Sequence, residues 1–148
     1  MNKQILVRFV LGVAAFAIFG GVAMAQQGGP YSYYTVTPCR VFDTRNTSSP
    51  IAGGTTVNFQ VRGTCGIPMS AKAVSYNLAV VLPTMQTHLI LWASGDPRPS
   101  VSAINVGAND LPTSNGGVVA LSTNAQDLSV YNAFGSVHVI FDVTGYFQ

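Results

Sequence analysis

Charged residues are scarce in this chain: seven Lys and Arg, five Asp and no Glu make up 8% of 148 residues. Soluble domains usually carry about 25% charged residues. A disordered chain is excluded, because disorder requires low hydrophobicity and high net charge, whereas 48% of this chain is hydrophobic. Basic residues are too few to neutralise a row of phosphates, which excludes a nucleic-acid binder of the basic-patch kind. The lack of Glu excludes any mechanism that needs two Glu carboxylates.

Signatures of catalysis and of metal binding are also missing. The two histidines are His88 and His138. No Gly-x-Ser-x-Gly elbow marks a serine nucleophile that either histidine could activate. Glycoside hydrolysis needs two positioned carboxylates, and no pair of Asp residues stands out. Calcium wants about six to eight oxygen ligands, and no run of Asp and Asn supplies them. The sequence therefore predicts a protein that is not an enzyme and has no cofactor and no metal.

The first 25 residues have the layout of a secretory signal peptide. Lys3 and Arg8 give a positively charged start, residues 9–22 are apolar, and residues 23–25 (Ala-Met-Ala) form a small-x-small cleavage site. The apolar stretch is shorter than the about 20 residues of a membrane-spanning helix; an uncleaved anchor is the alternative. We expect residues 26–148 to form a single domain without a membrane span, in a secreted, extracellular or periplasmic location.

Only two cysteines are present, Cys39 and Cys65, and both lie in the part predicted to be exported. Disulfides persist in such compartments, so we expect these two residues to be bonded. The bridge would close a loop of about 27 residues and stabilise the fold by roughly 3–4 kcal/mol in the chain-entropy model. Two free thiols or a metal pair are the alternatives, but two distant cysteines without a clustered His make a poor zinc site.

The rest of the chain has the pattern of short β-strands. Apolar and polar residues alternate with a period of two, and Gly, Pro, Asn and Asp interrupt the runs. Residues 107–117 are polar and rich in Gly and Asn, and we expect them to be the longest loop. The pattern predicts an all-β fold, a two-sheet β-sandwich (jelly-roll or Ig-like) of about eight strands. The expected strand segments are 33–37, 40–42, 55–62, 73–82, 88–93, 101–106, 118–122, 128–132 and 137–144.

Four segments carry a resemblance to a known family: residues 38–45 (PCRVFDTR), 66–77 (GIPMSAKAVSYN), 102–105 (SAIN) and 138–147 (HVIFDVTGYF). Together they resemble largely uncharacterised β-domains of exported proteins from soil-type bacteria, often attached to or repeated beside other surface modules. The resemblance covers nearly all of residues 26–148. It implies an exported bacterial β-domain and supplies no catalytic residue. Residues 84–88 depart from the family, because they lack its Gly-containing turn.

Charged residues in the first and last of these segments are candidates for a structural ion pair. Asp142 lies within the last expected strand, where a carboxylate is costly to bury without a partner, and we expect Arg40 or Arg45 to provide one. Asp43 and Arg45 are two residues apart and share a strand face. In the structural interpretation Asp43 caps a turn; in the functional one it is a sugar-binding or catalytic residue held by Arg45. A calcium site on Asp142 and Asp43 is a further alternative.

Aromatic residues supply the candidate ligand site. Tyr31, Tyr33 and Tyr34 precede the core, and Trp92 is the single tryptophan. These four rings could form a platform for sugar rings, and ordinary strand packing is the alternative.

The sequence thus predicts an exported, non-catalytic surface or extracellular-matrix module that binds carbohydrate, such as a cell-surface glycan, or another extracellular protein. The alternatives are a self-assembling structural subunit of an extracellular fibre or layer and a small secreted hydrolase. A binding module should have one aromatic-lined concave face. Self-assembly should leave an unpaired strand edge or a large apolar patch. A hydrolase should place an Asp or His with a perturbed environment in a pocket.

Overall fold

The computed structural model describes residues 29–47 and 49–148. The expected signal peptide, residues 1–25, lies outside this part. Within it there are nine strands and no helix, so no helix there could span a membrane. The strands are β1 (Tyr33–Asp43), β2 (Ile51–Ala52), β3 (Thr55–Phe59), β4 (Ala73–Val81), β5 (Thr87–Ala93), β6 (Ile104–Val106), β7 (Thr113–Ala120), β8 (Leu128–Asn132) and β9 (Ser136–Phe147).

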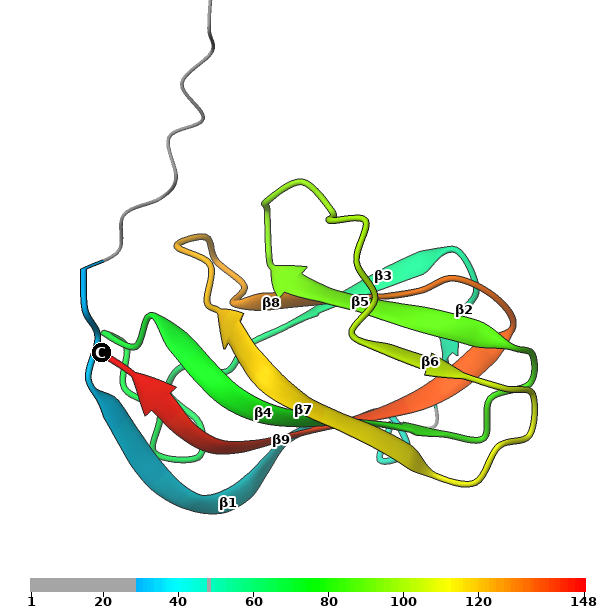
Figure 1. Cartoon of the computed structure of the whole chain (residues 1–148), viewed down its shortest axis with the longest axis horizontal. Helices are drawn as coiled ribbons and strands as arrows, with labels where there is room; N and C mark the ends of the chain where they lie inside the picture. The colour runs from blue at the N-terminus through cyan, green and yellow to red at the C-terminus, as the bar shows by residue number, and fades with distance from the viewer. Residues whose placement is uncertain (1–28, 48) are drawn as a thin grey trace, which may run out of the picture.

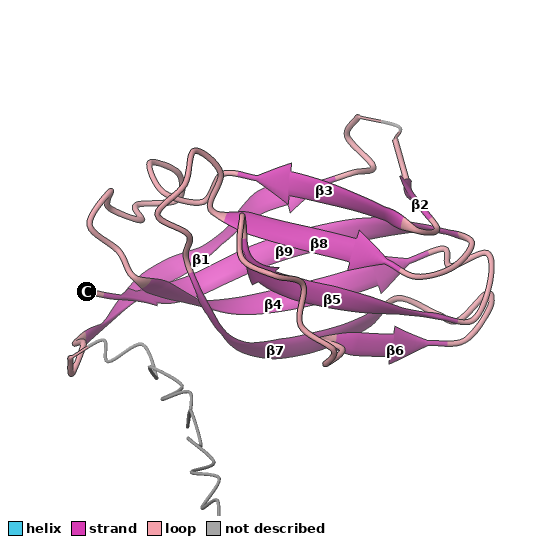
Figure 2. Cartoon of the chain, turned by 90° about the horizontal axis from the view of Figure 1, so that it is seen from above, coloured by secondary structure: helices cyan, strands magenta, loops and turns pink. Residues whose placement is uncertain are grey.

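Two antiparallel sheets pack face to face, which confirms the predicted two-sheet β-sandwich (Figures 1 and 2). The five-stranded sheet has the order β1-β9-β4-β7, and β2 pairs with the start of β9. The four-stranded sheet has the order β3-β8-β5-β6. The first and last strands pair over most of their length, from Tyr33 opposite Phe147 to Asp43 opposite Ile140. The two ends of the fold are therefore joined in one ladder.

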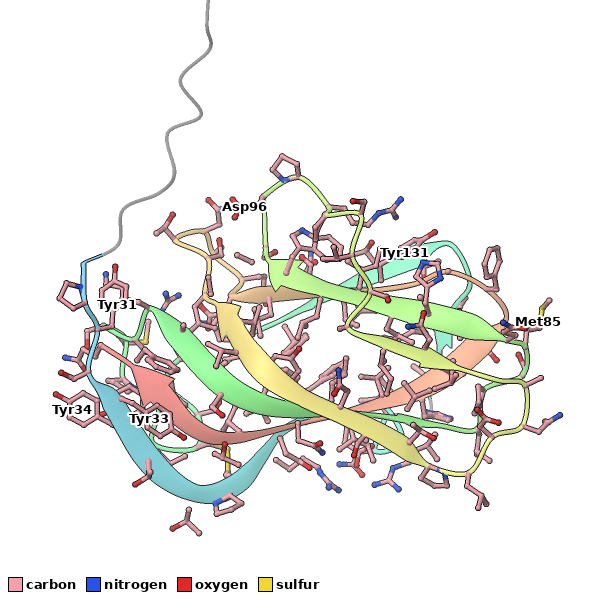
Figure 3. All side chains as sticks on the ribbon, viewed as in Figure 1. Tyr31, Tyr33, Tyr34, Met85, Asp96 and Tyr131 are labelled. Atoms are coloured by element: carbon pink, nitrogen blue, oxygen red, sulfur yellow. A yellow bond between two sulfur atoms is a disulfide. The ribbon has the colours of Figure 1, made fainter. Side chains whose placement is uncertain are left out.

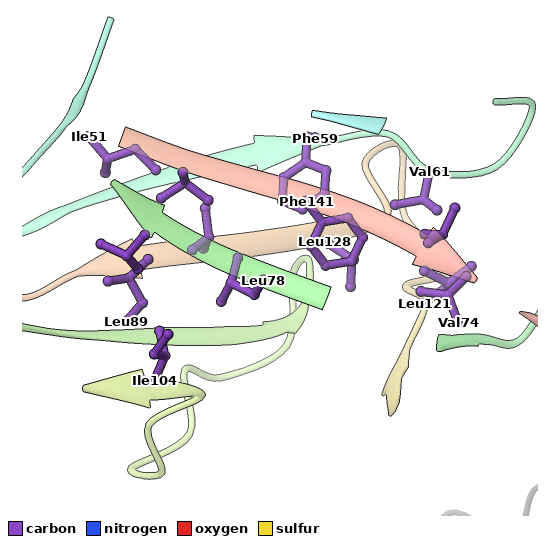
Figure 4. Packing of buried hydrophobic residues seen from close by; sticks show 14 of the residues in the cluster. Ile51, Phe59, Val61, Val74, Leu78, Leu89, Ile104, Leu121, Leu128 and Phe141 are labelled. Carbon is purple, nitrogen blue, oxygen red and sulfur yellow. The ribbon is translucent and has the colours of Figure 1, made fainter. Parts of the chain in front are cut away.

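The core lies between the sheets and is built by strand alternation (Figure 4). The ring of Phe141 in β9 is fully buried, with its centroid 5.1 Å from that of Phe59 in β3 and 5.3 Å from that of Tyr76 in β4. Burying one such side chain stabilises a fold by about 1.5–3 kcal/mol. Both sheets thus contact the same aromatic residue, which fixes how one sheet sits on the other.

The predicted disulfide is confirmed. Cys39 in β1 is bonded to Cys65, and the two Cα atoms are 5.7 Å apart. Cys65 lies in the turn before β4 and has a φ of 53°. The glycines on this turn, Gly63 and Gly66, also have positive φ, at 79° and 74°, a conformation that costs glycine little. The bond therefore ties an edge strand to a tight turn.

Most strand boundaries differ from the sequence expectation; for example, β3 ends at Phe59 instead of 62 and β6 begins at Ile104 instead of 101. Residues 33–43 form one strand with two irregularities in register instead of two strands, and the two-residue β2 was not expected. The expected loop at 107–117 is wrong in its second half, because β7 begins at Thr113 and pairs with β4 through Gly117. The stretch Thr-Ser-Asn-Gly-Gly has low strand propensity. This stretch is extended because its backbone pairs with β4, and not because its own residues favour a strand.

A buried ion pair that the sequence analysis did not single out holds the loops near the disulfide. Asp127 is fully buried, and its Oδ2 accepts hydrogen bonds from the backbone N–H groups of Val61 and Arg62 at 2.8 and 2.7 Å. Its Oδ1 accepts from the Arg62 guanidinium, which also donates to the carbonyls of Ala71 and Ser122. The pair is satisfied on every side, as a buried charge must be.

Candidate functional site

A pocket of about 490 Å³ lies at the end of the sandwich where β4 leads into β5, far from the C-terminus (Figure 1). We call it the end pocket. Three segments line it: the start of β5 with the residues before it, the end of β6, and the turn between β8 and β9. The lining residues are Met85, Gln86, Thr87, His88, Asn105, Val106, Gly107 and Phe134.

Polar side chains of the end pocket come from neighbouring strands. His88 of β5 and Asn105 of β6 are directly opposite each other in the ladder. Opposed residues share a face with their Cβ atoms about 5 Å apart, so the imidazole and the carboxamide stand side by side. Gln86 is two residues before His88. These three side chains together offer both donors and acceptors of hydrogen bonds.

An aromatic ring stands beside the polar groups. The centroid of the Phe134 ring is 6.2 Å from that of the His88 ring, and the two rings meet edge to face. Phe134 is 56% exposed. A large apolar ring left open to solvent next to hydrogen-bonding groups is a combination that ligand pockets use.

A buried polar network positions the Phe134 turn. The hydroxyl of Thr87 donates to Oδ1 of Asn132 at 2.7 Å and accepts from the backbone N–H of Phe134 at 2.9 Å. The Asn132 amide in turn donates to the carbonyl of Ile51 at 2.9 Å. Thr87 and Asn132 are both buried. The ring that borders the pocket is therefore held by its backbone, while its side chain is free to meet a ligand.

Exposed apolar side chains gather in the loops at this end. Leu82 follows β4 and is 69% exposed, and Met85, Leu111 and Phe134 are exposed as well. Leu82 has a φ of 54°, in the left-handed region that costs a non-glycine residue about 1–2 kcal/mol. The backbone N–H of Asn109 donates to the carbonyl of Pro83 at 2.7 Å, which joins the loop before β7 to the loop after β4. Residues 84–88 contribute four of the lining residues.

The four aromatic residues that the sequence offered as a platform do not lie together. Tyr33 and Tyr34 are on β1 of the five-stranded sheet, and Trp92 is on β5 of the four-stranded sheet. Figure 3 shows Tyr31, Tyr33 and Tyr34 at one end of the molecule and Met85 at the opposite end. Tyr33 pairs with the ring of Phe147 and Tyr34 stacks on Tyr146, with centroids 5.0 and 5.1 Å apart. The Trp92 indole N–H donates to the carbonyl of Asp96 at 3.0 Å.

The charged candidates do come together, in what we call the ion-pair cluster: Arg40, Asp43, Arg45 and Asp142. Arg40 Nε donates to Asp142 Oδ1 at 2.8 Å, and its Nη1 donates to Asp43 Oδ2 at 3.3 Å. Arg45 holds Asp43 with two side-chain bonds of 2.9 and 2.7 Å. The carboxylate oxygens of both Asp residues thus face guanidinium groups, an arrangement that disfavours a bound cation.

Electrostatics of the cluster follow from this geometry. The Arg45 side chain lowers the pKa of Asp43 from 3.8 to about 2, and the Arg45 backbone N–H and the charge of Arg40 act in the same direction. The hydrogen bond that Arg40 donates to Asp142 is the main cause that raises the pKa of Arg40. Both Arg residues are about half exposed, and an exposed ion pair contributes about 0–1 kcal/mol. Asp43 is the buried member.

His138 contacts the residue between Asp43 and Arg45 and does not line the end pocket. Its Nδ1 lies 3.0 Å from the hydroxyl of Thr44, which also accepts from the backbone N–H of Val139. Asp142 is four residues further along the same strand, about 13 Å away at the rise of a β-strand. In the described residues, no three His, Cys or acidic side chains are close enough together to hold a metal ion.

Comparison with protein-family models finds no family that matches this chain, and a search of curated proteins finds no match either. The end pocket and the ion-pair cluster are therefore interpreted from their own geometry and chemistry.

Proposed function

We propose that this protein is an exported, non-catalytic surface or matrix module of bacterial type that binds carbohydrate in the end pocket. The observation that carries the proposal is the juxtaposition of one exposed aromatic ring, Phe134, with the hydrogen-bonding side chains of His88 and Asn105. Export is supported by the disulfide, since such bonds persist in oxidising compartments. The bacterial surface setting is supported by the resemblance of residues 38–45 and 138–147.

Carbohydrate suits this pocket because a sugar ring has two kinds of surface. Its C–H groups can pack on an aromatic face, and its hydroxyls both donate and accept hydrogen bonds. Phe134 meets the first need, and His88, Asn105 and Gln86 meet the second. The volume of about 490 Å³ lies within the about 300–1,000 Å³ typical of small-ligand pockets.

Binding without catalysis is supported by the lining residues. None of them is an Asp, Glu, Ser or Cys, whereas glycoside hydrolysis uses two carboxylates and acyl transfer uses an activated nucleophile. The one hydroxyl in the lining, that of Thr87, is already bonded to Asn132 and to the backbone N–H of Phe134. A neutral pocket in a protein with few charges suits an uncharged sugar better than an acidic one.

The test is a glycan-array screen of the exported protein, followed by titration of the best ligand against two variants. Phe134→Ala removes the ring at the end pocket and should weaken binding at least tenfold, which is about 1.4 kcal/mol. Tyr31→Ala is the matched control, because it removes an exposed ring at the opposite end of the molecule and should leave binding unchanged.

The reverse result, with Tyr31→Ala defective and Phe134→Ala normal, would move the site to the tyrosine cluster. Thermal unfolding of both variants shows whether each is folded. A folded wild-type protein that binds no glycan on the array would contradict the proposal.

A further inference from the structure

β7 is a regular edge strand, and the backbone groups on one of its sides have no partner strand in the part of the chain that the structure describes. It pairs with β4 through eight consecutive residue pairs, from Ala73 opposite Ala120 to Val80 opposite Thr113, without a bulge. Its other side has no strand partner (Figures 1 and 2). Within the described residues, no backbone hydrogen bond joins 113–120 to any segment other than β4. The outward N–H and C=O groups of a regular eight-residue strand are therefore available.

The usual protections of an edge strand are missing from β7. Natural proteins protect edges with charged residues, Pro, bulges or short strands. The edge strand β1 has Pro38, Arg40 and two register irregularities, and the edges of the other sheet are the five-residue β3 and the three-residue β6. β7 has eight residues, no charge, no Pro and no bulge. Val119 of β7 packs against the core, and one side-chain hydrogen bond, 2.7 Å from Asn115 to the carbonyl of Ala103, links β7 to the segment before β6.

The sequence of β7 is complementary to itself. A partner strand must be extended and must have free backbone groups, and another β7 meets both conditions without bringing a charge or a Pro to the interface. A twofold axis perpendicular to the sheet pairs residues that lie on the same face, so an axis at Gly116 would place Gly116 opposite Gly116 of the other copy, and no side chain would hinder the approach at the centre. The same axis would place Ser114 opposite Val118, and both side chains are exposed in the single chain. One surface patch then serves both partners, as a twofold interface requires.

We propose that β7 is a dimerisation edge, at which two copies of this chain pair antiparallel about a twofold axis and join their five-stranded sheets into one continuous sheet. No residue of β7 lines the end pocket, so this interface is independent of ligand binding. Because the axis uses up both free edges, assembly ends at the dimer.

The experiment measures molar mass by light scattering during size-exclusion chromatography of the exported protein, from a few to about 100 micromolar. The wild-type protein should elute as a dimer. Val118→Lys puts a charge at the middle of the edge and should elute as a monomer with an unchanged melting temperature. Thr56→Lys is the matched control, because it adds the same charge at an exposed position of the edge strand β3, and it should remain a dimer.

A cysteine experiment tests the register. A mixture of Ser114→Cys and Val118→Cys proteins under mild oxidation should yield a covalent dimer, and Thr56→Cys should yield none. A wild-type monomer at the highest concentration would overturn the proposal. So would a dimer that survives Val118→Lys, or assemblies larger than the dimer, which require head-to-tail pairing.

Discussion

Among single residues, Asp43 has the contacts that hold the end of β1 in place. Its side chain is buried, it accepts bonds from the backbone and the guanidinium of Arg45, and Arg40 contacts it from the other side. Arg40 also reaches Asp142 on β9. Through these contacts the corner after β1 is connected to the last strand of the sheet.

The depressed pKa of Asp43 predicts a specific loss of stability in acid. Its pKa is about 2 in the folded protein and about 3.9 in an unfolded chain. A folded pKa below the unfolded one stabilises the protein at pH above about 4, and this contribution is lost as the pH falls from about 4 to about 2. Asp43→Asn should therefore melt well below the wild-type protein at pH 7.

The gap between the two melting temperatures should narrow between pH 4 and pH 2. Differential scanning calorimetry across this range gives the comparison. Asp142→Asn serves as the control for a more exposed member of the cluster. A gap between wild type and Asp43→Asn that stays constant from pH 7 to pH 2 would show that the charge of Asp43 does not stabilise the fold.

Sequence patterns reveal residue pairs unevenly. Arg40 and Asp142 could be proposed as partners because a carboxylate inside an apolar strand calls for a cation, and the chain has few. Nothing local marked Arg62 and Asp127, since each lies in a loop, where a charged residue is ordinary. Their contact depends on loops that follow β3 and precede β8, which only the packing of the sheet brings together.

At the scale of elements, the turn between β8 and β9 is held by side chains of β5. Thr87 and Asn132 are buried and bonded to each other, and Thr87 also receives the backbone N–H of Phe134. No sequence signal distinguishes this threonine from the other threonines of the chain. The same is true of the pocket residue Phe134. An aromatic residue in a short turn looks like any exposed loop residue until its neighbours in space are known.

Thr87→Val should destabilise the protein by about 1–3 kcal/mol, because it leaves buried groups of Asn132 and Phe134 without partners. It should also weaken ligand binding, because the turn that holds the Phe134 ring loses its anchor. Denaturant unfolding measures the first effect, ligand titration measures the second, and hydrogen exchange at the Phe134 amide reports the loosened turn. Thr56→Val is the control on an exposed strand position and should change stability by less than about 0.5 kcal/mol. Equal unfolding free energies for Thr87→Val and Thr56→Val would contradict this account.

At the scale of the whole molecule, the disulfide connects parts of the chain that the sheet alone does not hold together. Cys39 belongs to an edge strand, and Cys65 belongs to the turn that leads into β4, a strand at the middle of the same sheet. β1 touches the rest of its sheet only through β9. The bond therefore gives the edge strand a second attachment.

Replacing both cysteines with Ala should lower the free energy of unfolding by roughly 3–4 kcal/mol in the chain-entropy model. Guanidinium unfolding of the oxidised wild type and the double variant gives the difference, and the two proteins should share the same strand content by circular dichroism. The wild type under reducing conditions is the control, and it should match the variant. A difference below about 1 kcal/mol would mean that the unfolded state is not constrained by this bond.

The sequence by itself determined the all-β class, the two-sheet sandwich and the pairing of the two cysteines, because alternation with a period of two and the presence of just two cysteines can be read directly from the chain. Only the tertiary structure decided that residues 113–117 are a strand and that His88, Asn105 and Phe134 meet at one end. It also decided that the tyrosines and Trp92 lie on different sheets. The physical reason is that alternation determines on which face of a strand a side chain lies. The neighbours of that side chain on the next strand depend on strand order and register, and these are determined jointly by residues that are far apart in the chain.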